Sequence, residues 1–391
     1  MPVGRRSNAL KMRILLNATA IELDRLGGDF THYRDWLRMK QEPLSFELVS
    51  DGALRSWQGL VRKIAERATR TWQPAWFRRR LFLFSRFLYV PSESAAAADV
   101  IFSHLLFPWM KRNSAPVVWN SQGISPSRYY DTYNRGQWTV EDVAWVYREL
   151  GRKADALVIF TYSCARNVVA RCPELSDKIY VVPAPIFVDR EKASAKPSLR
   201  DGVLRVLFIG IDAERKGLPE VVEAYRAVRE RFEDVQLDIV SQPSQTLQEK
   251  IAGLKDARLH VSSQRVDVKA LMQRADIFLL PTHADTYALA AIEAMAHGCA
   301  VIVSDLEPLP EVIPDGEVGF SVPVGDAHAL AEKFTRLVDD KILLRTFQEN
   351  ARRRFTSLHA PEVVAGRIEE VFSQVLRRKS GFEAQTLMKQ L

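Results

Sequence analysis

The sequence predicts an α/β protein built from two domains, each a parallel β-sheet with helices on both faces. Three observations favour this fold class. Short β-rich apolar runs alternate with helical stretches along the chain, as they do where helices connect parallel strands. The 391 residues are more than one ordinary core requires. The alternation also stops once, in a stretch rich in proline, serine and charge, and then restarts.

The first half begins with an apolar stretch at residues 12–19, which we interpret as a buried strand. Basic residues precede it, as in a signal peptide, but Glu22 and Asp24 close it early, and the strand is the better interpretation. A turn at Gly27 and Gly28 and a helix follow. The pattern then predicts strands at 46–50, 99–106, 115–121, 154–161 and 178–185, and helices at 140–152 and 162–171.

Residues 184–202 lose this periodicity and predict a linker between domains. The second half predicts strands at 204–211, 235–241, 258–263, 276–281 and 299–305, with helices at 218–232, 268–275 and 286–298. Both halves are therefore Rossmann-like. We expect an N-terminal domain at 1–185, a linker at 186–202, a C-terminal domain at 203–365, and a helix and tail at 366–391 that cross back to the N-terminal domain.

The composition limits the classes of function that the chain can have. No apolar run is long enough to span a membrane, and the three cysteines fit neither a metal site nor an even disulfide set. We therefore expect a cytoplasmic protein. From Arg55 to Arg86 nine basic residues stand against one acidic residue, interleaved with aromatics. Two interpretations stay open: peripheral binding to an anionic membrane, or a solvated helical pair. No nucleic-acid-binding module accompanies this stretch, so we expect no nucleic-acid partner.

The turn after residues 204–211 carries candidate phosphate-binding groups. It contains neither a Gly-x-Gly-x-x-Gly run nor a Gly-Lys-Ser/Thr P-loop. Gly210 opens the turn, and Lys216 with Gly217 begins the next helix. A lysine beside the exposed N–H groups of a helix N-terminus offers positive charge to a phosphate.

A second candidate site lies in the stretch HADTYALAAIEAMAHG, residues 283–298. The loop here follows a strand, Asp285 is expected at or near the N-cap of the helix, and Gly298 closes the helix as its C′ residue. Glu293 then lies about two turns into the helix. Both carboxylates can accept hydrogen bonds from sugar hydroxyls. From the residues alone, Asp285 as a plain cap and Glu293 as a solvated residue are equally good interpretations.

This stretch, with LRVLFIGIDAERKGLPEVVEAY before it and LPEVIPDGEVGFSVPVGD after it, resembles the retaining glycosyltransferases of family 4, which have the GT-B fold. Their Glu-x7-Glu hallmark corresponds to Asp285-x7-Glu293. The resemblance implies two domains facing a central cleft, a nucleotide-sugar donor, no metal and no protein nucleophile. In such enzymes the leaving diphosphate is thought to take the acceptor's proton on the front face of the sugar.

The resemblance also implies roles for individual residues. Lys216 would contact the donor diphosphate and Glu293 the ribose, while Asp285 would lie near the donor sugar. The glycines would let loops approach the phosphates closely. The expected catalytic residues are Asp285, Glu293, Lys216 and His104. The expected donor-binding residues are Gly27, Gly28, Gly210, Arg215, Lys216, His283, Asp285, Thr286, Tyr287, Ala288, Leu289 and Glu293. For His104 a packed structural histidine is an equal alternative.

The chain departs from the family pattern at three places. Ile211 stands where the family usually has a diphosphate-binding arginine, which Arg215 could replace. Thr286-Tyr287-Ala288 replaces Gly-Phe-Gly, and residues 120–123, Asn-Ser-Gln-Gly, stand where many members carry a histidine. A lost charge-assisted hydrogen bond would weaken donor binding by about 1.5–3 kcal/mol.

We therefore expect a retaining glycosyltransferase of cell-surface polysaccharide or glycolipid synthesis. Its partners would be a UDP- or GDP-sugar donor, a saccharide or lipid-linked acceptor, and the inner face of the cell membrane through Arg55–Arg86. The nucleotide sugar is a co-substrate, so no cofactor is expected. Two alternatives stay open: a degenerate protein that binds a nucleotide or glycan without turnover, and a sugar-nucleotide epimerase of the same fold.

Overall fold

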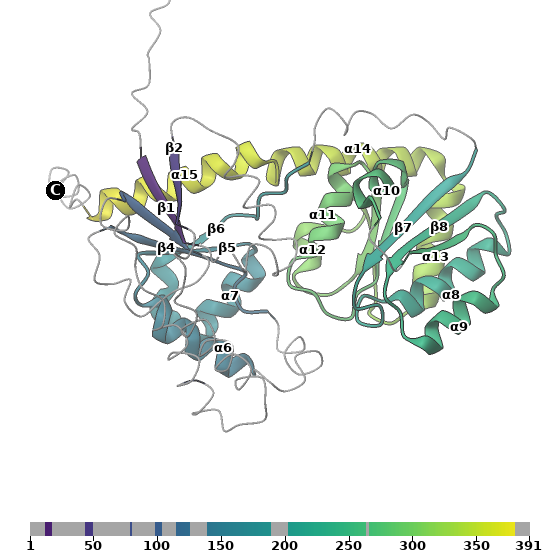
Figure 1. Cartoon of the computed structure of the whole chain (residues 1–391), viewed down its shortest axis with the longest axis horizontal. Helices are drawn as coiled ribbons and strands as arrows, with labels where there is room; N and C mark the ends of the chain where they lie inside the picture. Colours follow the sequence, from purple (N-terminus) through teal and green to yellow (C-terminus); the bar gives the residue numbers. More distant parts are fainter. Residues whose placement is uncertain are drawn as a thin grey trace, which may run out of the picture. The chain divides into compact units, whose positions relative to one another are not determined.

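The computed structural model describes residues 79, 98–103, 115–125, 139–188, 202–262 and 266–379, and the backbone of 12–17 and 44–49. The chain forms two compact units (Figure 1). The first comprises Met1–Ala184 and Ala365–Leu391, and the second comprises Pro185–Val364. Several sequence predictions lie outside the described residues: Gly27, Gly28, His104, all of Arg55–Arg86 except Arg79, and most of the linker.

The first unit contains a six-stranded parallel sheet in the order β2-β1-β3-β4-β5-β6. Its strands confirm the six predicted for this half, with shorter bounds for all but β2, which begins two residues earlier and ends one residue earlier than predicted. They are β1 (Met12–Asn17), β2 (Leu44–Val49), β3 (Val100–Ser103), β4 (Val117–Ser121), β5 (Ala156–Ile159) and β6 (Ile179–Val181).

Helix α6 (Val140–Val146) continues as a π-helical turn at Tyr147–Gly151, and α7 (Tyr162–Arg171) follows β5. A capping box at Thr139 and Asp142 begins α6. Asp142 is buried, and Arg79 donates to its Oδ1 atom over 2.8 Å. Arg79, one arginine of the basic stretch, is thus held in an ion pair with its side chain 28% exposed.

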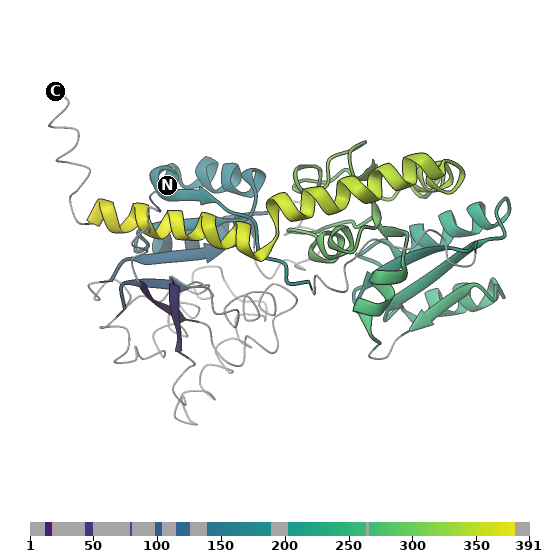
Figure 2. The same cartoon turned by 90° about the horizontal axis from the view of Figure 1, so that it is seen from above.

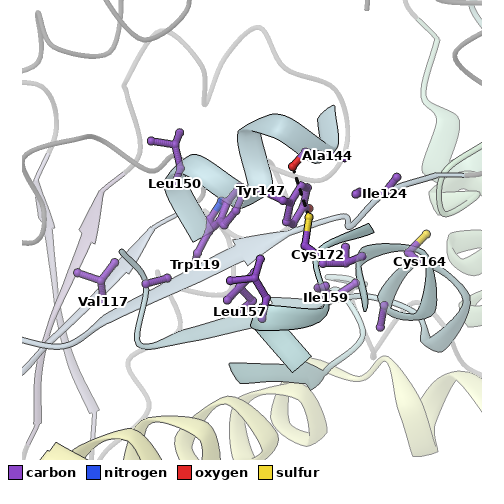
Figure 3. Close-up of a cluster of buried hydrophobic side chains, with 14 of the residues drawn as sticks. Val117, Trp119, Ile124, Ala144, Tyr147, Leu150, Leu157, Ile159, Cys164 and Cys172 are labelled. Carbon is purple, nitrogen blue, oxygen red and sulfur yellow. Dashed lines mark hydrogen bonds between the residues drawn. The ribbon is translucent and has the colours of Figure 1, made fainter. Parts of the chain in front are cut away.

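The core on one face of this sheet lies under α6 and α7 (Figure 3). Trp119 of β4 stacks on Tyr147 with ring centroids 4.6 Å apart, and the Cys172 thiol donates to the Ala144 carbonyl over 3.4 Å. Cys164, Cys172 and Cys299 are all buried free thiols. Their packing explains them as small apolar core residues.

Helix α15 (Pro361–Lys379) covers the other face of the first sheet (Figure 2). Phe372 meets Phe102 of β3 edge to face, with ring centroids 5.5 Å apart. The neighbouring residue Ile101 belongs to the core under α6 and α7. Successive residues of β3 thus point to opposite faces, as the pleat of a strand requires, and the C-terminal helix completes the core of the N-terminal sheet.

The second unit is also a six-stranded parallel sheet, in the order β12-β11-β10-β7-β8-β9. Helices α8, α9 and α13 cover one face, and α11 and α14 cover the other (Figure 1). The strands are β7 (Leu204–Gly210), β8 (Val235–Ser241), β9 (Leu259–Ser262), β10 (Ile277–Leu280), β11 (Ala300–Ser304) and β12 (Gly319–Val322). The helices are α8 (Leu218–Arg229), α9 (Gln245–Gly253), α10 (Val268–Arg274), α11 (Leu289–Ala296), α12 (Leu309–Val312), α13 (Ala327–Asp339) and α14 (Lys341–Leu358).

The strand order places a topological switch point between β7 and β10. The chain moves outward from β7 to β8 and β9, then returns to the other side of β7 and moves outward again from β10. The loops after β7 and β10 therefore leave the sheet in opposite directions, and the crevice between them is where ligands bind in open parallel sheets. This geometry brings Lys216 and Asp285 to the same edge.

Several elements of the second unit differ from the prediction. The predicted helix at 218–232 ends at Arg229. The elements α9, α12, β12, α13 and α14 have no counterpart in the prediction. In α9 the nine residues carry only two buried apolar positions, Leu247 and Ile251. A further difference, at the start of α11, bears on the site and is described below. Within the described residues no helix is long and apolar enough to cross a membrane.

Candidate functional site at the carboxyl edge of the second sheet

The turn between β7 and α8 is shaped by Gly217. This residue adopts φ +84° and is the N-cap of α8, which confirms that Lys216 and Gly217 begin the helix. A Cβ atom at Gly217 would lie 2.0 Å from the carbonyl oxygen of Pro281, just after β10. Only glycine permits both this left-handed backbone and this close approach. The Lys216 stem lies over Gly210, where an added Cβ would come within 2.7 Å of it.

Asp285 lies at the centre of the site and is 8% exposed. Its Oδ1 atom accepts hydrogen bonds from the backbone N–H groups of Thr286, Tyr287 and Ala288 at 2.8, 3.2 and 3.0 Å. Its Oδ2 atom accepts from the ammonium of Lys216, whose side chain is 19% exposed. One carboxylate therefore joins the turn after β7 to the turn after β10.

The charge of Asp285 is well compensated. Burial alone raises the pKa of its carboxyl, but the Lys216 ammonium and the backbone N–H groups of Ala288 and Tyr287 outweigh burial and hold the pKa below its usual range. Asp285 is thus ionised at neutral pH, and hydrogen-bond donors among the described residues contact both of its carboxylate oxygens.

Helix α11 begins later than the sequence predicts. The predicted start at Thr286 is wrong: the N-cap is Ala288, and the helix spans Leu289–Ala296. Asp285 consequently lies three residues before the N-cap and accepts from the turn that precedes the helix. The cause is Ala288, whose φ of 55° and ψ of 49° interrupt the helical backbone. The predicted end is confirmed, because Gly298 follows the last turn with φ +69°.

One face of α11 remains half exposed while the rest of the helix is buried. The half-exposed positions of the helix are Leu289, Ala290 and Glu293. Their spacing places them on a single stripe. Glu293 thus lies on the same side of the helix as Leu289, one turn further along. Ala291, Ile292, Ala294, Met295 and Ala296 are buried.

Residues 189–354 match the family model Glycosyl transferases group 1. The second half of this chain is thus similar to the group 1 glycosyltransferases. The phosphatidyl-myo-inositol mannosyltransferase of Mycobacterium leprae is 34% identical over 204 residues, 50% of this chain and 52% of the relative. The MMP alpha-(1->4)-mannosyltransferase of Mycolicibacterium hassiacum is 28% identical over 240 residues, 59% and 57% of the two chains. These matches span little more than half the length of either relative.

Solved structures agree on the fold. Sucrose-phosphate synthase from Thermosynechococcus elongatus superposes with a TM-score of 0.65 at 18% identity, covering 94% of this chain and 100% of the other. Anabaena HepE in complex with UDP and glucose gives 0.60 at 14% identity, covering 93% and 100%. Two parallel-sheet α/β units of the GT-B type are therefore the fold of this glycosyltransferase-related chain.

Ile211, which stands where the glycosyltransferase pattern usually has arginine, is 80% exposed. Arg215 is turned toward the loop that carries Asp285: its Nε atom donates to Asp212 Oδ2 over 2.9 Å and its Nη1 atom to the Ala284 carbonyl over 2.8 Å. Its own carbonyl accepts from the backbone N–H of His283 over 2.8 Å. Arg215 thus braces this loop with both its side chain and its backbone.

His283 is held by an acid that the sequence patterns did not single out. Its Nε2 atom lies 2.8 Å from Glu220 Oε1 in the first turn of α8. The other carboxylate oxygen of Glu220 is buried and has no hydrogen-bond partner among the described residues. An acid in the first turn of a helix is a usual favourable position, so the sequence signal for Glu220 was present but unspecific.

The structure brings together a subset of the predicted site residues. Lys216, Asp285 and the turn Thr286–Ala288 are in direct contact, with Gly210 beneath Lys216 and Arg215 and His283 bracing the same loop. Tyr287 points into the core, where it is 1% exposed, so only its backbone lies at the site. Leu289 and Glu293 lie on the half-exposed stripe of α11. Gly27, Gly28 and His104 lie outside the described residues.

Proposed function

We propose that this protein is a retaining glycosyltransferase that transfers a sugar from a UDP- or GDP-sugar to a saccharide or lipid-linked acceptor. The observation that carries the proposal is the meeting of Lys216 and the start of α11 at the switch point of a sheet whose sequence is similar to the group 1 glycosyltransferases. A cation and a helix N-terminus at such a crevice are suited to a diphosphate.

Two backbone donors support a diphosphate at α11. The first N–H groups of a helix have no partner inside the helix. Asp285 takes up those of Thr286, Tyr287 and Ala288 in the preceding turn. The N–H groups of Leu289 and Ala290 are the next donors along the chain, and both residues are half exposed. In the proposed complex these two groups and Lys216 face the donor phosphates.

Glu293 is assigned to the ribose. It lies one turn beyond Leu289 on the same stripe of α11. A nucleotide whose diphosphate binds at the start of the helix would bring its ribose, the next moiety, to this turn. A carboxylate that accepts from both hydroxyls of a vicinal diol is a favourable charge-assisted contact. Uracil and guanine nucleotides share this ribose, so the assignment holds for either base.

The proposed chemistry is front-face transfer. The bond from the anomeric carbon to the diphosphate oxygen breaks, a bond to the acceptor oxygen forms on the same face, and the leaving diphosphate takes the acceptor's proton. The anomeric configuration is retained. Lys216 supplies positive charge where negative charge develops on the leaving group, and the site positions the two substrates. We propose that neither a metal nor a cofactor takes part.

The acceptor is proposed to be lipid-linked, in glycolipid or polysaccharide synthesis at the inner face of the membrane. The names of two relatives support this setting: phosphatidyl-myo-inositol mannosyltransferase and the capsular polysaccharide glycosyltransferase CapM of Staphylococcus aureus. The basic and aromatic composition of Arg55–Arg86 also suits a membrane surface. The protein itself is proposed to be cytoplasmic and peripheral to the membrane.

Thermal shift with UDP, GDP, ADP and CMP tests the donor site. We expect one nucleotide to raise the melting temperature by several degrees, since saturation at 100 Kd stabilises by about 2.7 kcal/mol. Glu293→Ala should abolish the shift. Glu332→Ala, an exposed acid in α13, should keep it. A chain that none of the four nucleotides stabilises would contradict the proposal.

A binding protein without turnover is the second candidate. Two observations favour it: Ile211 replaces the expected arginine and is exposed, and Lys216 is already engaged by Asp285. Hydrolysis of the nucleotide sugar in the absence of acceptor separates the candidates. An enzyme releases nucleoside diphosphate slowly under these conditions. A protein that the nucleotide sugar stabilises, but that releases no nucleoside diphosphate even at high protein concentration, is a binder.

A further inference from the structure

We infer that Asp285 is a positioning residue that acts on the donor's diphosphate through Lys216, and that it makes no contact with the donor sugar. The inference rests on the proposed function and assigns Asp285 a different part from the one that the resemblance to family 4 implies. It follows from how the two oxygens of this one carboxylate are used.

The hydrogen-bonding capacity of Asp285 is nearly filled. A carboxylate offers about four lone-pair sites. The N–H groups of Thr286, Tyr287 and Ala288 share the two lone pairs of Oδ1 and fill them, and Oδ2 holds the Lys216 ammonium. The residue is 8% exposed. Burial leaves little access to the second lone pair of Oδ2, and a sugar hydroxyl that instead displaced one of these partners would leave a donor without an acceptor, which is costly.

Lys216 is the one partner of Asp285 with charge to offer a ligand. Its flexible four-carbon stem loses rotamer freedom when the ammonium is held in one place. The ion pair with Asp285 and the packing over Gly210 hold it before any donor arrives. An ammonium has three N–H donors, so one bond to Asp285 leaves others for phosphate oxygens.

The negative charge of Asp285 does not cancel this benefit. Its Oδ1 atom faces three backbone N–H groups at the start of α11, where the partial positive charge of a helix N-terminus adds to them. Removing the charge therefore adds little attraction for an anion, while the ordering of Lys216 is lost. We expect weaker diphosphate binding when Asp285 is neutralised.

The variant Asp285→Asn tests the link between Asp285 and Lys216. The asparagine oxygen can still accept from the three N–H groups of the turn, but its NH2 group then faces the Lys216 ammonium, donor against donor. Lys216→Met removes the charge and keeps the stem. Asp326→Asn is the matched control, because Asp326 also accepts a backbone N–H, that of Ala329, as the cap of α13. Urea unfolding of each variant confirms that it is folded.

The experiment measures calorimetric Kd values for UDP and UDP-glucose, and for GDP and GDP-mannose, in wild type, both single variants and the double variant. We expect Asp285→Asn to raise Kd about tenfold, equivalent to 1.4 kcal/mol, and equally for the diphosphate and its sugar nucleotide. When Lys216→Met is already present, Asp285→Asn should raise Kd no further.

Two results would overturn the inference. A loss confined to the sugar nucleotide would show that Asp285 contacts the sugar, and a tenfold loss that persists without Lys216 would show that it acts on its own. Wild-type protein that binds none of these ligands would contradict the proposed function itself, and the inference with it. The three patterns are distinct.

Discussion

The hydroxyl of Tyr287 lies 3.2 Å from Nδ1 of His359, and both side chains are buried in the second unit. Their rings meet edge to face with centroids 6.1 Å apart. His359 is the C-cap of α14, and Tyr287 donates its backbone N–H to Asp285. The end of α14 therefore anchors, from the buried side, the turn that carries the candidate site.

Tyr287→Phe should destabilise the protein by about 1 kcal/mol. The ring keeps its packing, but one buried hydrogen bond is lost, and such bonds contribute about 0.5–1.5 kcal/mol. Tyr287→Ala should cost about 3–5 kcal/mol because it also leaves a cavity. Urea unfolding of the two variants measures both values. A Tyr287→Phe variant as stable as wild type would mean that the hydroxyl contributes nothing to the anchor.

Ala288→Gly should stabilise the protein by about 1 kcal/mol. Ala288 holds the left-handed backbone at φ 55°, which costs a residue with a Cβ roughly 1–2 kcal/mol. Glycine adopts this conformation without strain. The matched control is Ala290→Gly, two residues on within α11, where glycine should destabilise by about 0.5–1 kcal/mol. Changes in melting temperature of opposite sign for the two variants would confirm the prediction, and changes of the same sign would contradict it.

Gly217→Ala should be strongly destabilising, by about 3 kcal/mol or more, because overpacking against backbone adds to left-handed strain. The added Cβ would meet the Pro281 carbonyl oxygen at 2.0 Å, forcing apart the turns after β7 and β10. Gly366→Ala in α15 is the control: nothing lies within 4 Å of its added Cβ, so alanine should be neutral or slightly stabilising. Soluble yield and melting temperature report both effects.

The acid stability of the second unit should depend on Asp256. Arg229 donates to its Oδ2 atom over 2.7 Å and the Tyr225 hydroxyl over 3.0 Å. These bonds, with Arg229 as the main cause, lower the pKa of Asp256 to about 2 from an ordinary 3.8. A depressed folded-state pKa contributes stability that is present above the unfolded value and lost as pH falls toward the folded value.

The free energy of unfolding of wild type relative to Asp256→Asn measures this contribution. Above pH 4 wild type should be more stable by about 1–2 kcal/mol, a value reduced for partial exposure to solvent. The difference should shrink as pH falls from 4 to 2. A difference that stays constant across this window would show that the ion pair does not titrate with folding.

Much of the second sheet could be predicted because its signals are local. Runs such as Val235–Ser241 are apolar and β-branched, and the structure has this strand with the predicted bounds. The cap at Gly298 was also predictable, since a glycine after an apolar helical run marks a C-terminus. Elements α9, α12, β12, α13 and α14 were not predicted; in α9, few buried positions give little periodicity.

The start of α11 could not be read from the sequence for a physical reason. Thr286, Tyr287 and Ala288 suit a helix by pattern, but Asp285 accepts all three of their N–H groups, and Ala288 takes a left-handed backbone. The Asp285 carboxylate that accepts them is itself held by Lys216, 69 positions away in the chain. Local propensity cannot report a partner at that separation.

The sequence by itself determined the two parallel-sheet units, the turn that carries Lys216 and the loop that carries Asp285, because apolar period, glycine and proline act within a few residues. Only the tertiary structure decided that one carboxylate joins those turns, that Arg215 braces the loop, and that Tyr287 faces the core. Each of these depends on the strand order that sets β10 beside β7, and strand order is chosen by packing between distant segments.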